Sequence, residues 1–86
     1  MRKIKLNESS NIKAAWYDTE LELLDICFHS GLTYRYIGVP QKLVSLWQQA
    51  ESVGSYASKV FIGKKGARPF DHVLVGITPV ELEQVI

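Results

Sequence analysis

The sequence predicts an α+β domain, with a small antiparallel β-sheet of three or four strands and two short helices packed on one face. Apolar and polar residues alternate over residues 2–7, 11–17 and 21–28, which is the pattern of half-buried strands. After Pro40 the apolar spacing changes to the helical period. With 47% hydrophobic and 22% charged residues, the 86 residues have the composition of a single globular domain, 1–86.

The first two alternating runs predict two strands with assigned faces. Residues 2–7 carry lysines between apolar residues, and lysines protect an edge strand from unwanted pairing. In the second run, Ile12 and Trp16 share one face and are expected to be buried. Strict alternation then places Lys13 and Tyr17 on the opposite, solvent-facing side.

The loop between the third strand and the next one sets their register. A three-residue loop, His29-Ser30-Gly31, with the glycine at positive φ, places Ile26 opposite Tyr34 and Leu24 opposite Tyr36. A two-residue loop would place polar or acidic residues opposite the same tyrosines. Because a slip of one residue turns a whole strand over, the three-residue loop is favoured, since it collects the apolar residues on one side. Both tyrosines are therefore expected on the core face.

Two helices are expected after this strand. Pro40 suits the first turn of a helix because its missing N–H is not needed there. A corner at residues 52–54 interrupts the helical pattern, and Ser55 is expected to cap a second short helix. The apolar stripe of the first helix comprises Leu43, Leu46, Trp47 and Ala50, with Val44 at its margin.

The C-terminal residues form an extension, 63–86, with three expected parts. Residues 63–69 contain two glycines, a proline and three basic residues, which indicates a flexible basic loop. Residues 72–77 are apolar enough for one more strand. Thr78 followed by Pro79 and Glu81 is the pattern of a helix start, so residues 79–86 are expected to form a final turn or two.

Charge and cysteine content define the expected compartment. The formal net charge is +1, which neither favours nor excludes a nucleic acid. Cys27 is the only cysteine, so an internal disulfide cannot form. Since no apolar run resembles a signal peptide or a membrane span, the expectation is a soluble cytoplasmic protein with no membrane association.

One pattern raises the question of catalysis. Asp25, Cys27 and His29 alternate along a strand, which is the residue set of an activated thiol nucleophile. Side chains two residues apart on a strand run parallel, however, and do not converge. Cys27, His29 and His72 also match no zinc-binding spacing. We therefore predict no enzymatic activity, no catalytic residue, no metal and no cofactor.

Between residues 9 and 62 a set of residues stands in a specific order and spacing. The set is Ser9–Ile12, Tyr17-Asp18, a strand ending in Phe28, Ser30-Gly31, Tyr34-Arg35-Tyr36, Val39-Pro40, Ala50, Ser52, Gly54-Ser55-Tyr56 and Ile62. This set resembles the KTSC domain family, and the resemblance leaves 63–86 as an extension. It implies a small module found at the C-terminus of some lysyl-tRNA synthetases and as a stand-alone protein in bacteria and phages. It also implies a central Tyr-x-Tyr motif, here Tyr34 and Tyr36, and a proposed role in RNA binding.

The candidate binding residues follow from the predicted faces. If Tyr34 and Tyr36 point inward, Arg35 points outward, and basic and aromatic side chains on that face suit phosphates and bases. The basic loop adds further cations. The expected nucleic-acid contacts are Lys13, Tyr17, Arg35, Lys64, Lys65 and Arg68.

Two alternatives stay open at this point. Tyr34 and Tyr36 are either core residues, which the loop favours, or a stacking platform for unpaired bases. The leading function is a non-catalytic module that binds RNA. The rival is a protein-binding adaptor or inhibitor, acting through a sheet edge or an exposed aromatic side chain, or as a homo-oligomer.

Overall fold

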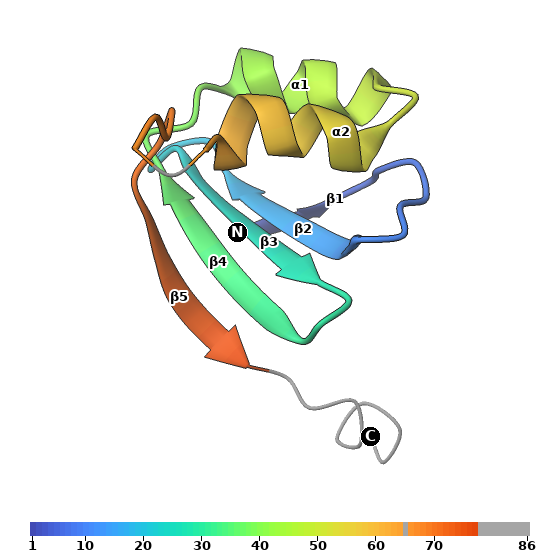
Figure 1. Cartoon of the computed structure of the whole chain (residues 1–86). Helices are drawn as coiled ribbons and strands as arrows, with labels where there is room; N and C mark the ends of the chain where they lie inside the picture. The colour runs from blue at the N-terminus through green and yellow to red at the C-terminus, as the bar shows by residue number, and fades with distance from the viewer. Residues whose placement is uncertain (65, 78–86) are drawn as a thin grey trace.

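The computed structural model describes residues 1–64 and 66–77, and this part of the chain forms one antiparallel sheet with helices on one face (Figure 1). The α+β class with helices on one face is confirmed. The sheet has five strands in the order β1-β2-β3-β4-β5, more than the three or four expected. The strands are β1 (Arg2–Ile4), β2 (Ile12–Asp18), β3 (Leu23–Phe28), β4 (Leu32–Ile37) and β5 (His72–Ile77). The helices are α1 (Gln41–Gln49), α2 (Val53–Ala57) and the π-helix η1 (Ser58–Ile62).

The register between β3 and β4 confirms the three-residue loop. Leu24 pairs with Tyr36 and Ile26 pairs with Tyr34. Gly31 has a φ of 96°, and its N–H donates to the carbonyl of Phe28 at 2.9 Å. Both tyrosines therefore lie on the inner face of the sheet, the face toward the helices, as predicted.

Strand β2 departs from the predicted alternation. Its register with β3 shifts between Ile12 and Ala14, which leaves Lys13 as the extra residue of a β-bulge. Beyond the bulge every side chain points to the face opposite the predicted one. Tyr17 is only 5% exposed and belongs to the core, so its predicted outward position is wrong. Trp16, predicted to be buried, lies instead on the outer face.

Buried aromatic side chains bind the helices to the sheet and to each other. The hydroxyl of Tyr17 donates to the carbonyl of Val39, at the turn that leads into α1. The indole N–H of Trp47 donates to the carbonyl of Val53 at 2.9 Å, across the corner between α1 and α2. Phe61 packs edge-on against Trp47, with ring centroids 5.0 Å apart. The hydroxyl of Tyr17 and the indole N–H of Trp47 thus each donate a hydrogen bond to a backbone carbonyl inside the core.

Both helices differ from the sequence prediction in detail. In α1 the margin residue Val44 is buried, whereas Leu46 is 46% exposed, so the buried stripe is rotated by a fraction of a turn. The cap of α2 is Ser52 and not Ser55, because the Ser52 side chain accepts the N–H of Ser55 at 3.3 Å. None of the helices in the described part is long and apolar enough to cross a membrane.

The C-terminal extension contributes the predicted strand, β5, which pairs antiparallel with β4. Before it, an isolated bridge between Lys64 and Ala67 closes the basic loop. Gly63 has a φ of 67°, and a Cβ there would lie 2.4 Å from the ring of Pro69, so this loop requires a glycine. Lys65 and the predicted helix over residues 79–86 lie outside the described residues.

Candidate functional site

The outer face of the sheet, on which Arg35 was predicted to bind a ligand, contains an ion pair. Successive pairings align Lys3, Trp16, Asp25, Arg35 and Val73 in one row across the strands. Arg35 donates from Nε to Oδ1 of Asp25 at 2.8 Å and from Nη2 to Oδ2 at 3.0 Å. This pairing raises the pKa of the Arg35 guanidinium. Arg35 thus faces outward as predicted, but a neighbouring carboxylate balances its charge.

The predicted contact residues do not share one surface. Lys13 and Lys64 are exposed, and Tyr17 is buried. Arg68 lies on the inner side of the sheet, close enough to Tyr36 for its charge to act on that hydroxyl. The structure therefore separates Arg35 from Arg68 and brings Arg68 together with the tyrosines.

Asp25, Cys27 and His29, the residues considered for catalysis, each contact a different group and not one another. Both carboxylate oxygens of Asp25 accept from Arg35. Cys27 is buried, and its Sγ lies 3.8 Å from the carbonyl of Phe28. The Nε2 of His29 lies 3.2 Å from the carbonyl of Ser9. Over residues 1–64 and 66–77, no group of three acidic, histidine or cysteine side chains could hold a metal ion.

A groove of about 450 Å³ opens on the inner face, and we call it the aromatic groove. The start of β4 and the end of β5 extend beyond the helices, which leaves part of this face uncovered (Figure 1). Strands β3, β4 and β5, the end of η1 and the loops around Ser10 and His29 contribute to its walls. It is lined by Ser10, Asn11, Phe28, His29, Ser30, Leu32, Tyr34, Tyr36, Ile62, Arg68 and His72.

Four rings from three neighbouring strands form the floor of the aromatic groove. Phe28 and Tyr34 pack edge to face, with centroids 6.3 Å apart. His72 of β5 lies 5.5 Å from each tyrosine, stacked on Tyr36 and edge-on to Tyr34. Tyr36 is 2% exposed, whereas the other three rings are half-buried. The two tyrosines thus differ in role, because one closes the core and the other presents a surface to solvent.

Arg68 supplies a positive charge to this groove. Its Nη1 donates to the carbonyl of Ile62 at 3.4 Å, which holds the exposed side chain against the end of η1. Burial raises the pKa of the Tyr36 hydroxyl, and the nearby Arg68 charge opposes that rise. An exposed guanidinium beside half-buried rings suits a ligand with a planar group and an anionic group.

The sequence contained only part of the information for this groove. Strand parity places Phe28 on the face of the tyrosines, so Phe28 could have been predicted as a residue of the groove. His72 could not have been predicted there, because its place beside Tyr34 depends on β5 pairing with β4. No local pattern specifies that long-range pairing.

The comparisons with known proteins agree with the predicted resemblance. The model of the KTSC domain matches residues 8–64. The chain belongs to the KTSC domain family. An uncharacterized protein of Stutzerimonas stutzeri (strain A1501) is 36% identical over 61 residues, which cover 71% of this chain and 84% of that protein.

A solved KTSC structure extends the likeness beyond the matched residues. The crystal structure of a KTSC domain protein from Yersinia pestis has a TM-score of 0.74 and 29% sequence identity to this chain. The likeness covers 87% of this chain and 97% of that one. Because 87% is a larger share than residues 8–64 make up, the shared fold includes part of the flanking sequence.

Proposed function

We propose that this protein is a non-catalytic RNA-binding module and that single-stranded RNA binds in the aromatic groove. The observation that carries the proposal is the combination of half-buried rings, Phe28, Tyr34 and His72, with the guanidinium of Arg68. Proteins that bind single strands stack unpaired bases on aromatic side chains and hold the phosphates with basic ones. Duplexes present no free base to such a groove.

This proposal changes which residues are expected to bind. Arg68 and Tyr34 become the principal contacts, and Tyr36 supports them from the core. Arg35 is assigned a structural role. Its guanidinium donates two hydrogen bonds to the Asp25 carboxylate, which already balances the positive charge that a phosphate would need. Absence of catalysis stays a prediction.

Binding of a labelled single-stranded RNA at low salt tests the proposal. Replacing Tyr34→Leu removes a stacking ring, and since one stacked base contributes about 1 to 3 kcal/mol, affinity should fall about 5- to 150-fold. Arg68→Gln should reduce the slope of log affinity against log salt by about 0.7, the value for one phosphate contact on a single strand.

Lys59→Gln is the matched charge control. Lys59 is exposed on η1 and does not line the aromatic groove. Like Arg68→Gln, the Lys59→Gln variant removes one positive charge. Its slope of log affinity against log salt should nevertheless stay near that of the unchanged protein. The proposal fails if no RNA binds at low salt, or if Arg68→Gln and Lys59→Gln weaken binding equally.

A second candidate function, self-association, rests on the edge strand β5. Val73, Leu74 and Val75 are 48%, 49% and 43% exposed, and no described strand pairs with the free edge of β5. The opposite edge, β1, carries Arg2 and Lys3, which discourage pairing. A second copy of this chain, added antiparallel along β5, would extend the sheet and cover these residues.

Sedimentation over a range of protein concentrations and salt tests this candidate. Pairing through an apolar edge should be almost insensitive to salt, whereas RNA binding through phosphates must weaken steeply as salt rises. Val73→Lys should shift the protein toward the monomer, and Lys42→Gln, a change on the distant helix α1, should not. A monomer at every concentration would exclude self-association.

A further inference from the structure

A second hollow adjoins the aromatic groove at its His29 end. It has a volume of about 710 Å³ and lies between β1, the start of β2 and the segment that joins them. Ser10 and His29 line both hollows. The His29 N–H donates to the carbonyl of Asn11 at 2.9 Å, which holds the shared rim in place. The two hollows therefore meet at Ser10 and His29, at one end of the sheet.

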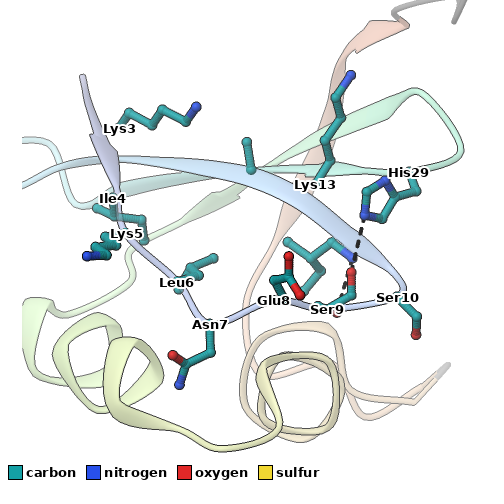
Figure 2. Close-up of a pocket in the computed structure, with 12 residues that line it drawn as sticks. Lys3, Ile4, Lys5, Leu6, Asn7, Glu8, Ser9, Ser10, Lys13 and His29 are labelled. Carbon is teal, nitrogen blue, oxygen red and sulfur yellow. Dashed lines mark hydrogen bonds between the residues drawn. The ribbon is translucent and has the colours of Figure 1, made fainter.

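The second hollow is basic, and we call it the lysine hollow. Among the described residues, Lys3, Lys5 and Lys13 line it together with the carboxylate of Glu8. Figure 2 shows Lys3 and Lys13 extending on the same side of β2, with His29 beyond Lys13. Lys13 is the extra residue of the β-bulge in β2. Unlike the aromatic groove, the lysine hollow has no aromatic ring besides His29 among the described residues that line it.

These two hollows differ in the part of a nucleotide that they suit. Rings in the groove suit bases, and ammonium groups in the lysine hollow suit phosphates, which Lys binds as a point charge. We propose that a single RNA strand continues from the aromatic groove over the His29 rim into the lysine hollow, where Lys3 and Lys13 bind the phosphates of the adjoining nucleotides. This inference rests on the proposed function and identifies its ligand as a strand of several nucleotides rather than a single nucleotide.

The length dependence of binding tests the proposed path. The probes are uridine monophosphate and single-stranded oligouridylates of increasing length, followed by chemical-shift perturbation for the short probes and by fluorescence anisotropy for the long ones. For the unchanged protein, affinity should rise with length and then level off. The double variant Lys3→Gln/Lys13→Gln should lose that rise, and its affinity for the mononucleotide should stay unchanged.

The salt dependence gives a second readout. Loss of two phosphate contacts on a single strand should reduce the salt slope for the longest probe by about 1.4. The matched control is Lys42→Gln/Lys59→Gln, which removes the same charge from exposed positions on α1 and η1 that line neither hollow. The control should keep both the length dependence and the slope.

Two results would overturn the path. One is a Lys3→Gln/Lys13→Gln variant that still gains affinity with length, and the other is a control variant that loses it equally. A different result would show that the proposed function itself is wrong. If Tyr34→Leu binds every probe as the unchanged protein does, the groove does not bind RNA. If Tyr34→Leu weakens every probe and the lysine double variant weakens none, only the path is wrong.

Discussion

At the residue scale, Asp25 shows how the neighbours of a side chain determine its role. It lies in the middle of the outer face, but its side chain is only 12% exposed. Trp16 stands beside it on one neighbouring strand and Arg35 on the other. A carboxylate so shielded from water needs a cation with matched geometry, and the bidentate guanidinium supplies it. On the outer face, the guanidinium of Arg35 therefore serves to stabilise the buried carboxylate of Asp25.

Removing that cation should be more costly than removing the carboxylate. Arg35→Gln leaves Asp25 shielded and unpaired, and we expect a loss of about 1–3 kcal/mol in the free energy of unfolding. Asp25→Asn should cost less, because the Arg35 side chain is 36% exposed and water can solvate it. Urea denaturation of both single variants and the double variant measures the coupling. If the two single losses simply add, the pair is not a stabilising unit.

Tyr17 gives a second prediction at this scale. Tyr17→Phe keeps the ring in the core but removes the hydrogen bond to the carbonyl of Val39. A buried acceptor without its donor typically costs about 1–3 kcal/mol, so the variant should unfold at lower urea. The control is Tyr34→Phe, since the Tyr34 ring is half-buried and its hydroxyl has water available. Equal losses in the two variants would show that the Val39 contact contributes little.

At the element scale, the strands show where sequence patterns suffice and where they do not. Between β3 and β4 the loop length and Gly31 determine the register, so the faces of Tyr34 and Tyr36 were predictable. In β2 the bulge at Lys13 reverses the alternation, and lysine is not a residue that marks a bulge. The burial of Tyr17 and the position of Trp16 on the outer face depend on that one inserted residue. Short-range alternation carries no information about such insertions.

The hairpin between β3 and β4 allows a matched test of its glycine. Gly31 has a φ of 96°, where a Cβ is strained, so Gly31→Ala should lower the free energy of unfolding by about 1–2 kcal/mol. Gly76→Ala is the control, because a Cβ there makes ordinary contact at 3.9 Å with Thr33. That change should be neutral or slightly stabilising. Thermal unfolding of both variants measures the two effects. An equal loss of stability in both would exclude backbone strain at Gly31 as the cause.

At the scale of the whole molecule, the residues that the sequence grouped into one site are divided between the two sides of the sheet. Arg35 faces outward with Lys13, whereas Arg68 lies at the inner groove with the tyrosines. Strand parity assigns a face within one strand, but it does not show where a distant loop such as 63–69 returns to the sheet. The family and the α+β class were therefore predictable, and the groove was not.

Burial of phenols should make the molecule sensitive to alkaline pH as a whole. Burial raises the pKa of Tyr17, Tyr36 and Tyr56, with Glu22 and Asp18 adding to the rise at Tyr17. Since the unfolded chain releases these protons near pH 10 and the folded chain releases them at higher pH, the folded state binds more protons between the two values. Their contribution to stability is thus complete below pH 10 and is lost as the pH rises through the raised pKa values.

Tyrosinate absorbance and circular dichroism, recorded together along an alkaline titration, test this linkage. The buried phenols should ionise together with unfolding, in a single step that follows the loss of circular dichroism. In Tyr17→Phe/Tyr36→Phe two of the linked groups are missing, so stability should fall less steeply with pH than in the unchanged protein, even though the variant is less stable at neutral pH. If all four tyrosines ionise while the fold persists, these hydroxyls are accessible and the packing of the core differs from that described.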